Sequence, residues 1–587
     1  MELLKSEIQS LVEKAVEGLG VEPSLVGKML QATRELDQGD LSLPCFPFAK
    51  SLGKAPADIA DAVCAAMPEH EAIGEVQAVN GYLNVRASPI WLANRLLDGT
   101  TLSDEHTQRR EVLIEHTSAN PNGPFHVGRA RNAILGDTLV RLHRLWGDDV
   151  TAEYYVDDMG KQVAVLAWAL ENMSADEVEG LLSDRDPVNP QWEHKADHQR
   201  VRWYQAAQRR RKESESATAI EEAIGSLVHA SEHGDERVLD AFAQAYQPVL
   251  DGMLETLGRL GIHFDRFTKE SLFVTNGDVA KLMAELGRLD INGVADNGAQ
   301  YLDLGQRGLK GKTEFFYRRG DGSSLYATRD IAYHRWKWTQ CSELINVLGE
   351  DHKLQAQQVG LTLEELGERR PEVMFYSFIK LPEGKMSTRR GNVVFMDDLL
   401  EEAHAQAADV LRERRPEMNE SEMDAIAEAV GTSAVRFNIV SVSPEKGFTF
   451  RWEDALSFEA GSAPFIMYSH TRACSIRRKV LEHDAAYSEP FQARAQADTE
   501  TPPGLVQLLR TLAVHNDRLS KVVREHRPNL FAEYLLHLAT AYNSFYRDCY
   551  IIENGTVNPF YFAISELART TLKAGMEGLG IVPLESM

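Results

Sequence analysis

One fifteen-residue segment constrains the fold of this chain more than any other. It runs from Glu115 to Arg129 and reads EHTSANPNGPFHVGR. The short apolar run 112–114 precedes it, and apolar residues at helical spacing follow it: Leu135, Leu139, Leu142 and Trp146. A strand, a loop and a helix in this order are typical of a nucleotide-binding α/β domain, in which free N–H groups at the helix start bind phosphate. The sequence predicts such a helix start near His126 and Gly128, where glycine lets a nucleotide approach the backbone.

Apolar runs alternate with helical stretches between residues 106 and 400. The later runs are Tyr154–Val156, Leu344–Leu348 and Met374–Leu381. This alternation is typical of βαβ units and predicts a parallel sheet. Residues 172–234 are charged and polar without a strand signal, and they are predicted to form a helical insertion in this domain.

Two short motifs resemble the signatures of class I aminoacyl-tRNA synthetases. The signature His-x-Gly-His corresponds to His126-Val127-Gly128-Arg129, with arginine in the last position. The signature Lys-Met-Ser-Lys-Ser corresponds to residues 385–389, which read KMSTR, with threonine in the fourth position. Each match is short, but the two together, in this order and on a chain of 587 residues, are specific.

The residues around these motifs narrow the resemblance to one family. The segments that carry it are Ile114–Asn120, Ala130–Asn132, Tyr155–Gln162 and Tyr326–Asp330. The chain is similar, over nearly its whole length, to arginyl-tRNA synthetases of the type common in archaea. This resemblance implies an α/β fold with a Rossmann-type parallel-sheet catalytic domain, an α+β N-terminal domain and an all-α C-terminal anticodon-binding domain.

Changes of pattern along the chain suggest the domain limits. Residues 1–105 are expected to form the N-terminal domain, which contacts the tRNA elbow in this family. The catalytic domain takes residues 106–400, with its helical insertion at about 172–234. Residues 401–455 form a connector near the inner corner of the tRNA, and residues 456–587 form the anticodon-binding domain, helical throughout and without a strand.

The resemblance implies an enzyme that attaches L-arginine to tRNA(Arg) in two steps. The arginine carboxylate attacks the α-phosphate of ATP, giving arginyl-adenylate and pyrophosphate, and the arginyl group then moves to the 3′-terminal adenosine of the tRNA. Neither step needs a covalent enzyme nucleophile, so catalysis depends on positioning and on fixed positive charge. In this family adenylate forms only when tRNA is bound, and the same dependence is expected here.

The resemblance assigns the ATP chemistry to both signature motifs. Catalytic roles are expected for His126, Arg129, Lys385 and Arg389, and Arg389 replaces the cation that Thr388 cannot supply. The expected ATP-binding residues are His126, Gly128, Arg129, Asp351, His352, Lys385, Met386 and Ser387. Mg²⁺ is expected to enter with ATP, held mainly by phosphate oxygens and water, and no protein metal site is predicted.

The substrate side chain is a guanidinium, which is best held by carboxylates that accept two hydrogen bonds. The resemblance places Tyr326 and Asp330 in the side-chain pocket and Asn120 at the α-amino group. Glu115 is either a direct ligand or a brace behind the ligands. Glu270 is a further candidate for contact with the guanidinium.

Contacts with tRNA are expected in both terminal domains. The candidate residues are Asn80, Tyr82, Asn84, Tyr542, Tyr546 and Met587. The first three could instead belong to an ordinary hairpin. Aromatic residues at helical spacing are usually core, so only one or two of the C-terminal tyrosines are expected to stack on bases.

The composition limits the partners and the compartment. The net charge is −25, so a tRNA surface must come from local basic clusters such as residues 477–479. No apolar run approaches the roughly 18–20 residues that span a bilayer, so we expect a cytoplasmic protein without a membrane partner. The five cysteines are scattered, which argues against a zinc site or disulfides. A monomer is the family default.

Three alternatives remain open from the sequence. A nucleotidyl transferase without a tRNA substrate would be much shorter. Another class I synthetase would need zinc ligands or a larger editing insertion. A tRNA-binding paralogue without activity is suggested only by Arg129 and Thr388, and the presence of His126, Lys385 and Asp330 counts against it.

Overall fold

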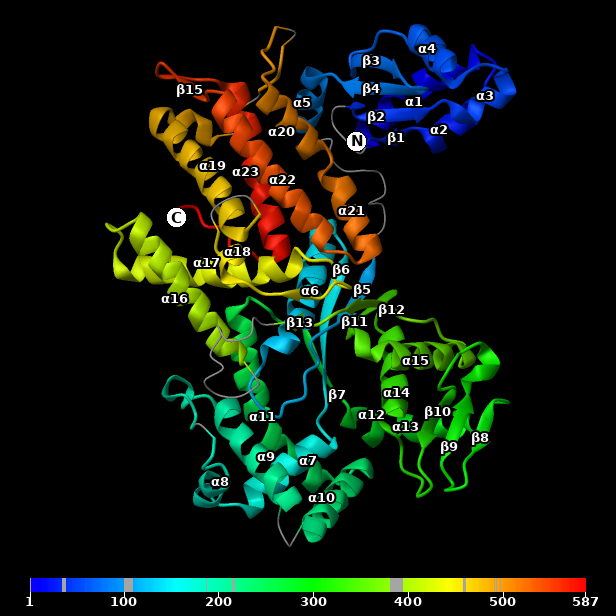
Figure 1. The fold of residues 1–587 in the computed structure, drawn as a ribbon, viewed down its shortest axis with the longest axis vertical. Helices are drawn as coiled ribbons and strands as arrows, with labels where there is room; N and C mark the ends of the chain where they lie inside the picture. The colour runs from blue at the N-terminus through cyan, green and yellow to red at the C-terminus, as the bar shows by residue number, and fades with distance from the viewer. Residues whose placement is uncertain are drawn as a thin grey trace.

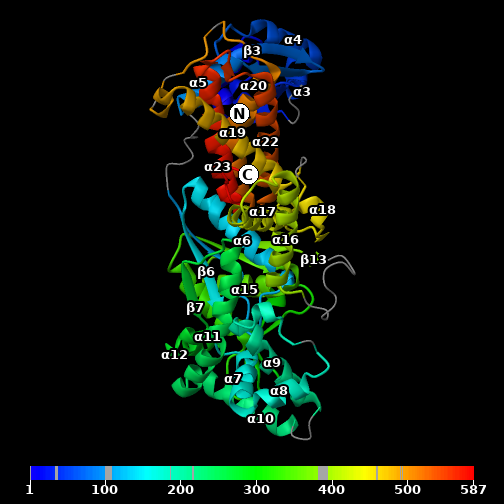
Figure 2. The same ribbon diagram turned by 90° about the vertical axis from the view of Figure 1, so that its left-hand side faces the viewer.

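The molecule is elongated, with the catalytic domain at one end of the long axis and the helical bundle and the N-terminal domain toward the other (Figure 1). A computed structural model describes residues 2–587 except 34–37, 100–108, 186, 214–216, 381–393, 458–460, 490, 492 and 497. Two perpendicular views show the C-terminal helical bundle between the N-terminal domain and the catalytic domain (Figures 1 and 2). Among the described helices, none is long and apolar enough to cross a membrane.

The catalytic domain is built on a five-stranded parallel sheet with the order β12-β11-β5-β6-β7. Its strands are β5 (Glu111–Glu115), β6 (Asp149–Val156), β7 (Arg266–Lys269), β11 (Glu343–Gly349) and β12 (Glu372–Tyr376). The predicted parallel sheet is therefore confirmed. The chain moves outward from β5 through β6 and β7 and later returns on the other side with β11. Ligands of such sheets bind outside the carboxyl ends of the strands where the order reverses, which here is between β5 and β11.

The last predicted apolar run, residues 374–381, is divided between two sheets. Strand β12 ends at Tyr376, and β13 (Ile379–Lys380) pairs instead with β14 (Phe448–Thr449) of the connector. The single strand expected there is therefore wrong over its second half. The apolar pattern could not distinguish the two strands, because the sequence has no Gly or Pro between Tyr376 and Ile379 to mark the end of the first.

Helices cover both faces of the parallel sheet. They are α6 (Val127–Trp146), α7 (Lys161–Asn172), α11 (Glu236–Arg259), α14 (Tyr326–Trp338) and α15 (Lys353–Glu365). The helix predicted after the signature loop is α6; Leu135, Leu139, Leu142, Arg131 and Asp137 are buried, and Trp146 is partly buried. This central position makes α6 the element that all neighbouring parts contact.

The segment predicted as a helical insertion is mostly helical in the described residues. It comprises α8 (Ala175–Leu181), α9 (Ala196–Glu213) and α10 (Ala217–Glu232), which pack against α7 and α11. Its basic run does not form a free cationic surface, because Arg209, Arg210 and Arg211 pair with acidic residues of the same insertion: Asp184, Glu177 and Glu221.

A second, antiparallel sheet in the catalytic domain has no counterpart in our sequence analysis. It follows α12 (Ser271–Thr275) and α13 (Asp278–Leu286) and comprises β8 (Asn292–Val294), β9 (Gln300–Asp303) and β10 (Glu314–Arg318). The available signals were the aromatic residues Phe315, Phe316 and Tyr317, a type that favours strands, and Gly298, which has a positive φ of 79° in the turn before β9.

The N-terminal domain has the expected α+β composition. Its elements are α1 (Glu2–Glu17), α2 (Val26–Met29), β1 (Gln31–Ala32), β2 (Leu41–Pro44), α3 (Phe46–Leu52), α4 (Pro56–Ala66), β3 (Ile73–Val79), β4 (Tyr82–Ala87) and α5 (Pro89–Leu97). The sheet order is β1-β2-β4-β3. Asn80 and Gly81 form the two-residue turn between β3 and β4 with φ of 50° and 83°, the geometry that favours an Asn-Gly pair.

The C-terminal domain is a helical bundle with one small hairpin. Its helices are α19 (Ala463–His483), α20 (Pro503–Ala513), α21 (His515–Glu525), α22 (Asn529–Asp548) and α23 (Pro559–Leu579). The expectation of no strand is wrong, because β15 (Ile552–Glu553) pairs with β16 (Thr556–Val557). The turn is again an Asn-Gly pair, Asn554 and Gly555, with φ of 49° and 76°.

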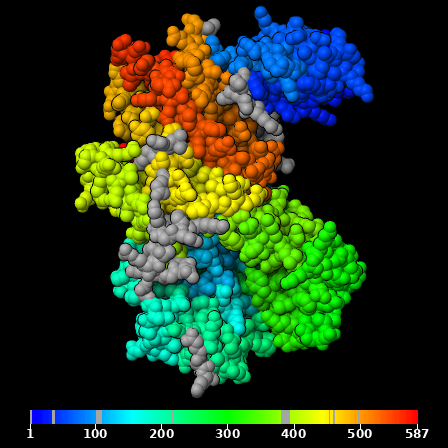
Figure 3. Space-filling view, viewed as in Figure 1, coloured from blue at the N-terminus to red at the C-terminus, as the bar shows by residue number. Residues whose placement is uncertain are grey.

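The connector joins the catalytic domain to the bundle. It comprises α16 (Met396–Arg414), α17 (Glu420–Val440), β14 and α18 (Trp452–Ala455), and Figure 3 shows its yellow part between the two domains. The buried Arg436 of α17 donates to Asp137 of α6 at 2.5 Å and to the carbonyl oxygens of Leu260 and Leu579 at 2.7 and 3.3 Å. One side chain therefore joins α6, the end of α11 and the end of α23.

Candidate active site

A cavity of about 550 Å³ opens at the carboxyl ends of β5 and β11. The signature loop, the first turn of α6, α14 and the ends of β6, β11 and β12 line it. It contains nine of the predicted site residues: Glu115, Asn120, His126, Gly128, Arg129, Tyr326, Asp330, Asp351 and His352. The predicted Lys385, Met386, Ser387 and Arg389 lie outside the described residues.

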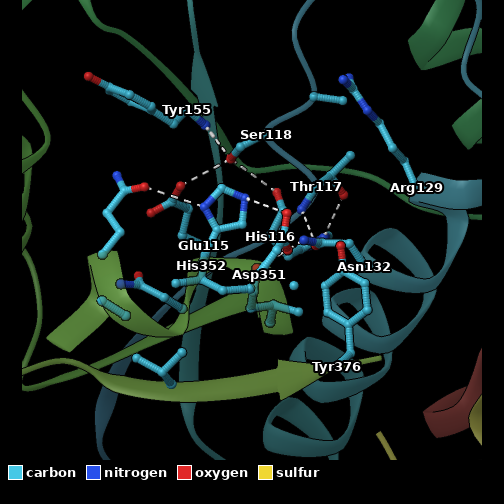
Figure 4. Close-up of a pocket in the computed structure, with 18 of the residues that line it drawn as sticks. Glu115, His116, Thr117, Ser118, Arg129, Asn132, Tyr155, Asp351, His352 and Tyr376 are labelled. Atoms are coloured by element: carbon cyan, nitrogen blue, oxygen red, sulfur yellow. Dashed lines mark hydrogen bonds and ion pairs between the residues drawn. The ribbon is translucent and has the colours of Figure 1, made fainter. Parts of the chain in front are cut away.

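The signature loop after β5 has an unusual backbone. Thr117 and Ser118 both have positive φ, 68° and 38°, which costs non-glycine residues about 1–3 kcal/mol each. Asn132 of α6 holds this conformation, because its Oδ1 accepts from the Thr117 N–H at 2.6 Å while its Nδ2 donates to the Val347 carbonyl at 2.9 Å. Asn132 thus ties the loop to the end of β11, across the point where the strand order reverses (Figure 4).

Both carboxylate oxygens of Glu115 are engaged within the protein. Ser118 Oγ donates to Oε1 at 3.1 Å, and Lys337 Nζ of α14 donates to Oε2 at 2.6 Å. Lys337 also donates to Asn346 Oδ1 at 3.1 Å. Of the two roles left open by the sequence, this geometry favours a brace that links β5, α14 and β11.

His126 stands at the N-cap of α6 with extended φ and ψ of −103° and 153°. A Cβ on Gly128 would lie 2.9 Å from the His126 ring, so only glycine at 128 allows this orientation of the imidazole. Burial and then the positive charge of Arg129 lower the pKa of His126 to about 4. The ring is therefore neutral at pH 7 and stands at the positive end of the α6 dipole, an arrangement suited to hydrogen bonding with phosphate.

Helix α14 presents a polar row to the cavity. Tyr326, Asp330 and His334 lie four residues apart, on one face of the helix, and all three line the cavity. His334 Nδ1 is 3.1 Å from Asp330 Oδ1. Burial acts to raise the pKa of Asp330, but His334 and Lys337 outweigh it and hold this pKa below its usual value. The cavity therefore contains an ionised carboxylate.

Glu270 does not line this cavity, and its expected contact with the guanidinium requires correction. Its carboxylate is fully buried and forms an ion pair with Arg329 Nε. Arg329 Nη1 also lies 3.4 Å from Glu232 of the insertion. Glu270 therefore holds the first turn of α14 through Arg329. A bound arginine would have to displace the Arg329 guanidinium to reach this carboxylate.

Sequence reasoning missed several residues of the cavity. Asp157 lies directly after β6, and its Oδ1 accepts from the Gly160 N–H at 3.0 Å. Its place after a strand with a parallel partner was the available signal. Gln355, Tyr376 and Phe378 also line the cavity, but they lie on α15 or at the end of β12, where the sequence carries no motif.

The candidate tRNA residues of the N-terminal domain lie together. Asn80, Tyr82 and Asn84 line a second cavity of about 760 Å³, together with Lys28. Tyr82 is 41% exposed, and its ring packs edge to face on Phe46 at 5.2 Å. The hairpin alternative is also correct as a description of the backbone, so this turn presents polar side chains from a regular hairpin.

The two C-terminal tyrosines have different environments. Tyr542 is fully buried and its hydroxyl lies 3.0 Å from Ser565 Oγ, so its expected contact with tRNA is corrected to a core position. Tyr546 is 39% exposed, and the Arg472 guanidinium lies 4.7 Å from its ring centroid. Tyr546 and Met587 line one cavity of about 290 Å³, with basic residues on its wall: Arg415, Arg472, Arg478 and Lys479.

Three protein-family models match the chain in succession. They are described as "Arginyl tRNA synthetase N terminal domain", matching residues 4–87, "tRNA synthetases class I (R), catalytic domain", matching residues 92–452, and "DALR anticodon binding domain", matching residues 466–587. The second alone spans more than half of the chain.

Curated proteins and solved structures give the same result. The chain is 41% identical to an arginine–tRNA ligase of Methanocella arvoryzae, covering 93% of each chain, and 40% identical to one of Archaeoglobus fulgidus, covering 94% and 96%. Its fold is similar to that of the Thermus thermophilus arginyl-tRNA synthetase, with a TM-score of 0.76 and 25% identity over 99% of this chain and all of that one. The chain therefore belongs to the arginyl-tRNA synthetase family, within class I of the aminoacyl-tRNA synthetases.

Proposed function

We propose that the cavity between β5 and β11 binds ATP and L-arginine together and activates the arginine for transfer to tRNA. As a member of its family the chain is an arginine–tRNA ligase that aminoacylates tRNA(Arg). The observation that carries the proposed site is the convergence of the helix α6 N-terminus and the acidic face of α14 in one cavity. The first suits phosphate and the second suits a guanidinium.

Arginine is proposed to lie against α14. Asp330 accepts hydrogen bonds from the guanidinium, and the Tyr326 hydroxyl lines the same cavity. Burial and nearby carboxylates keep the pKa of Tyr326 well above its usual value, so this hydroxyl stays protonated. Asn120 is assigned to the α-amino group; its Nδ2 donates to Gln162 Oε1 at 3.1 Å, which leaves its own Oδ1 to accept from an ammonium. Glu115 braces this wall.

ATP is proposed to lie across the start of α6 and the end of β11. His126 and Arg129 donate to phosphate oxygens, and Gly128 allows close approach to the backbone. Asp351 and His352, in the short turn after β11, contact the adenosine. The charged group that acts on His126 is Arg129, a cation, so Mg²⁺ would be held by the phosphates of ATP and by water and would neutralise their charge. Lys385, Met386, Ser387 and Arg389 keep their predicted role at the leaving pyrophosphate.

We assign tRNA contact to the surfaces at both ends of the molecule. Tyr546 and Met587 lie in a basic cavity of the bundle, which is matched by an anticodon-binding family model. Asn80, Tyr82 and Asn84 lie on the N-terminal domain. The predicted domain limits, a monomeric state, a cytoplasmic location and the dependence of adenylate formation on tRNA belong to the same proposal.

Pyrophosphate exchange tests the proposed site and its dependence on tRNA. We expect arginine-dependent exchange of labelled pyrophosphate into ATP when tRNA(Arg) is present, and at least tenfold less exchange, roughly 1.4 kcal/mol or more, without it. A tRNA specific for another amino acid serves as the control. Exchange that is equal with and without tRNA(Arg) would contradict the dependence, and tRNA binding without any exchange would favour an inactive paralogue.

Replacement of Tyr546 by alanine is expected to weaken tRNA(Arg) binding by about 1–3 kcal/mol, since stacking of one base on an aromatic ring is worth about that much. The Kd for tRNA, measured by filter binding, should rise, while the Tm and the KM for arginine stay unchanged. Tyr550→Ala is the control, because Tyr550 is 67% exposed but lies outside the basic cavity. Equal Kd values for both variants would remove Tyr546 from the tRNA surface.

A further inference from the structure

A buried polar cluster joins the helical insertion to the start of α16. Lys195 Nζ, just before α9, lies 2.9 Å from both carboxylate oxygens of Asp397. His198 Nε2 lies 2.9 Å from Asp397 Oδ2, and Thr256 Oγ1 of α11 donates to Oδ1 at 2.8 Å. All four side chains are almost fully removed from solvent. One carboxylate thus receives hydrogen bonds from three directions.

This cluster contains residue types that bind metals, but a lysine already supplies the cation. Asp197, His198 and Asp397 lie close enough together to hold an ion. The Lys195 ammonium lies 3.8 Å from Asp197 and 2.9 Å from Asp397, so its single charge balances Asp397, while burial raises the pKa of Asp197. Buried ion pairs often contribute little net stability, because desolvation of both charges opposes their attraction. The cluster therefore matters for the segment that it holds in place.

Asp397 stands directly beside the signature loop. The residue before it, Met396, donates its N–H to the Phe125 carbonyl at 2.7 Å, and the Val127 N–H donates to the Val394 carbonyl at 3.1 Å. Between these bonds, Phe395 forms an antiparallel bridge with His126. The backbone on both sides of His126 is thus hydrogen-bonded to the segment that ends in Asp397.

The insertion also contacts this segment through aromatic rings. The His198 ring lies 5.2 Å from the Phe395 ring in an edge-to-face arrangement, and it stacks on Trp192 at 5.8 Å. Trp192 Nε1 donates to Asp398 Oδ1 at 3.0 Å. The insertion therefore contacts three of the four positions that follow Val394: it packs on Phe395 and hydrogen-bonds with Asp397 and Asp398.

We propose that Lys195 and His198 are positioning residues, which hold His126 at the ATP site through Asp397 and the backbone pairing of Phe395 with His126. This inference rests on the proposed contact of His126 with ATP. The helical insertion then has a defined task in the reaction, because it fixes the segment against which the signature loop is aligned. An error of about 1 Å in the place of a catalytic group can cost on the order of 10²-fold in rate.

The first experiment compares Lys195→Met with the unchanged enzyme in pyrophosphate exchange with tRNA(Arg). We expect kcat/KM for ATP to fall by roughly tenfold to a hundredfold, while KM for arginine changes less than about twofold. Arg200→Met is the matched control: Arg200 also lies on α9, but it donates to the carbonyl oxygens of Gln244 and Ala245 on α11. The control should leave the use of ATP unchanged.

A double variant separates positioning from folding stability. Lys195→Met alone leaves the buried Asp397 charge without its lysine, so its Tm should fall; Lys195→Met with Asp397→Asn removes both charges and should recover most of that loss. Under the proposal, kcat/KM for ATP stays low in the double variant although Tm recovers. Recovery of kcat/KM for ATP together with Tm in the double variant would overturn the proposal. So would a normal kcat/KM for ATP in Lys195→Met, measured at a temperature well below the Tm of that variant.

The His126→Ala variant distinguishes failure of this inference from failure of the proposed site. If His126→Ala impairs the use of ATP and Lys195→Met does not, the site stands and the positioning role is wrong. If neither variant changes kcat/KM for ATP, the proposed role of His126 itself is wrong.

Discussion

Replacement of Asp330 by asparagine is expected to lower kcat/KM for arginine by roughly 10²–10³-fold, the largest effect at a single position of the arginine pocket. The variant keeps the shape of the side chain but removes the carboxylate charge from the face of α14 that lines the cavity. The arginine guanidinium loses hydrogen bonds to water when it enters this cavity. Its binding therefore requires the ionised carboxylate of Asp330, which replaces those hydrogen bonds.

The structure explains why Asp330 rather than Glu115 or Glu270 should carry this effect. Glu270 is paired with Arg329, and Glu115 is paired with Lys337, so both charges are already balanced within the protein. Asp330 lies beside His334, and its pKa stays below the usual value despite burial. Its charge is therefore present at pH 7 and faces the cavity.

Steady-state pyrophosphate exchange with varied arginine and saturating ATP measures the effect. KM for ATP should change little, and Asp278→Asn, which alters an exposed aspartate on α13, should behave as the unchanged enzyme. A loss for Asp330→Asn smaller than about fivefold, roughly 1 kcal/mol, would show that the guanidinium binds elsewhere in the cavity. Asp157 would then be the next position to change.

Replacement of His126 by alanine is expected to lower kcat for adenylate formation by about 10²–10³-fold, the range found when one preorganised donor to a developing anion is removed. The loss should appear with saturating ATP, because the contact is expected to strengthen as charge moves onto the phosphate oxygens.

His126→Asn provides a rescue, because an amide supplies one N–H at a position near the imidazole Nδ1. We expect it to recover part of the loss, while His233→Ala on the exposed surface of the insertion should have no effect. The pKa of His126 is about 4, so its protonation should produce no inflection in kcat between about pH 6 and 8. An inflection near the ordinary histidine pKa that disappears in His126→Ala would contradict a neutral ring.

The removal of histidines from solvent also determines how the stability of the folded protein changes as pH falls. His116 is buried and His515 is partly buried, and desolvation lowers the pKa of each to about 4. The unfolded chain binds protons near pH 6.5 and the folded chain does not, so these groups destabilise the protein as pH falls from about 6.5 to 4. Above that range they contribute no pH dependence.

Much of the catalytic domain could be predicted from local pattern. The apolar run before Glu115 and the helical spacing after Gly128 are determined by near neighbours, because strands and helices repeat over two and 3.6 residues. The Asn-Gly pairs at 80–81 and 554–555 form the same turn, although only the first was recognised. In the second, the short strands of two residues each were too brief to produce an alternating pattern.

The candidate site was predictable in its residue types but not in their partners. Tyr542 and Tyr546 lie one turn apart on α22, yet one is buried against α23 and the other is exposed. Glu270 and Asp330 are both carboxylates in the right part of the chain, but only Asp330 lines the cavity. Which side of a helix faces its neighbour depends on contacts between segments far apart in sequence, and one chain alone does not contain that information.

The sequence by itself determined the family, the order of the domains and the motif residues of the site, because each depends on a short run of neighbouring residues. Only the tertiary structure decided that Arg329 forms an ion pair with Glu270 and that Arg436 of the connector bonds to both the catalytic domain and the bundle. The same holds for the contact of Lys195 with Asp397, 202 positions away. These contacts are ion pairs and hydrogen bonds between groups that must be buried together. Burial is set by the packing of the whole chain, so no local pattern could reveal it.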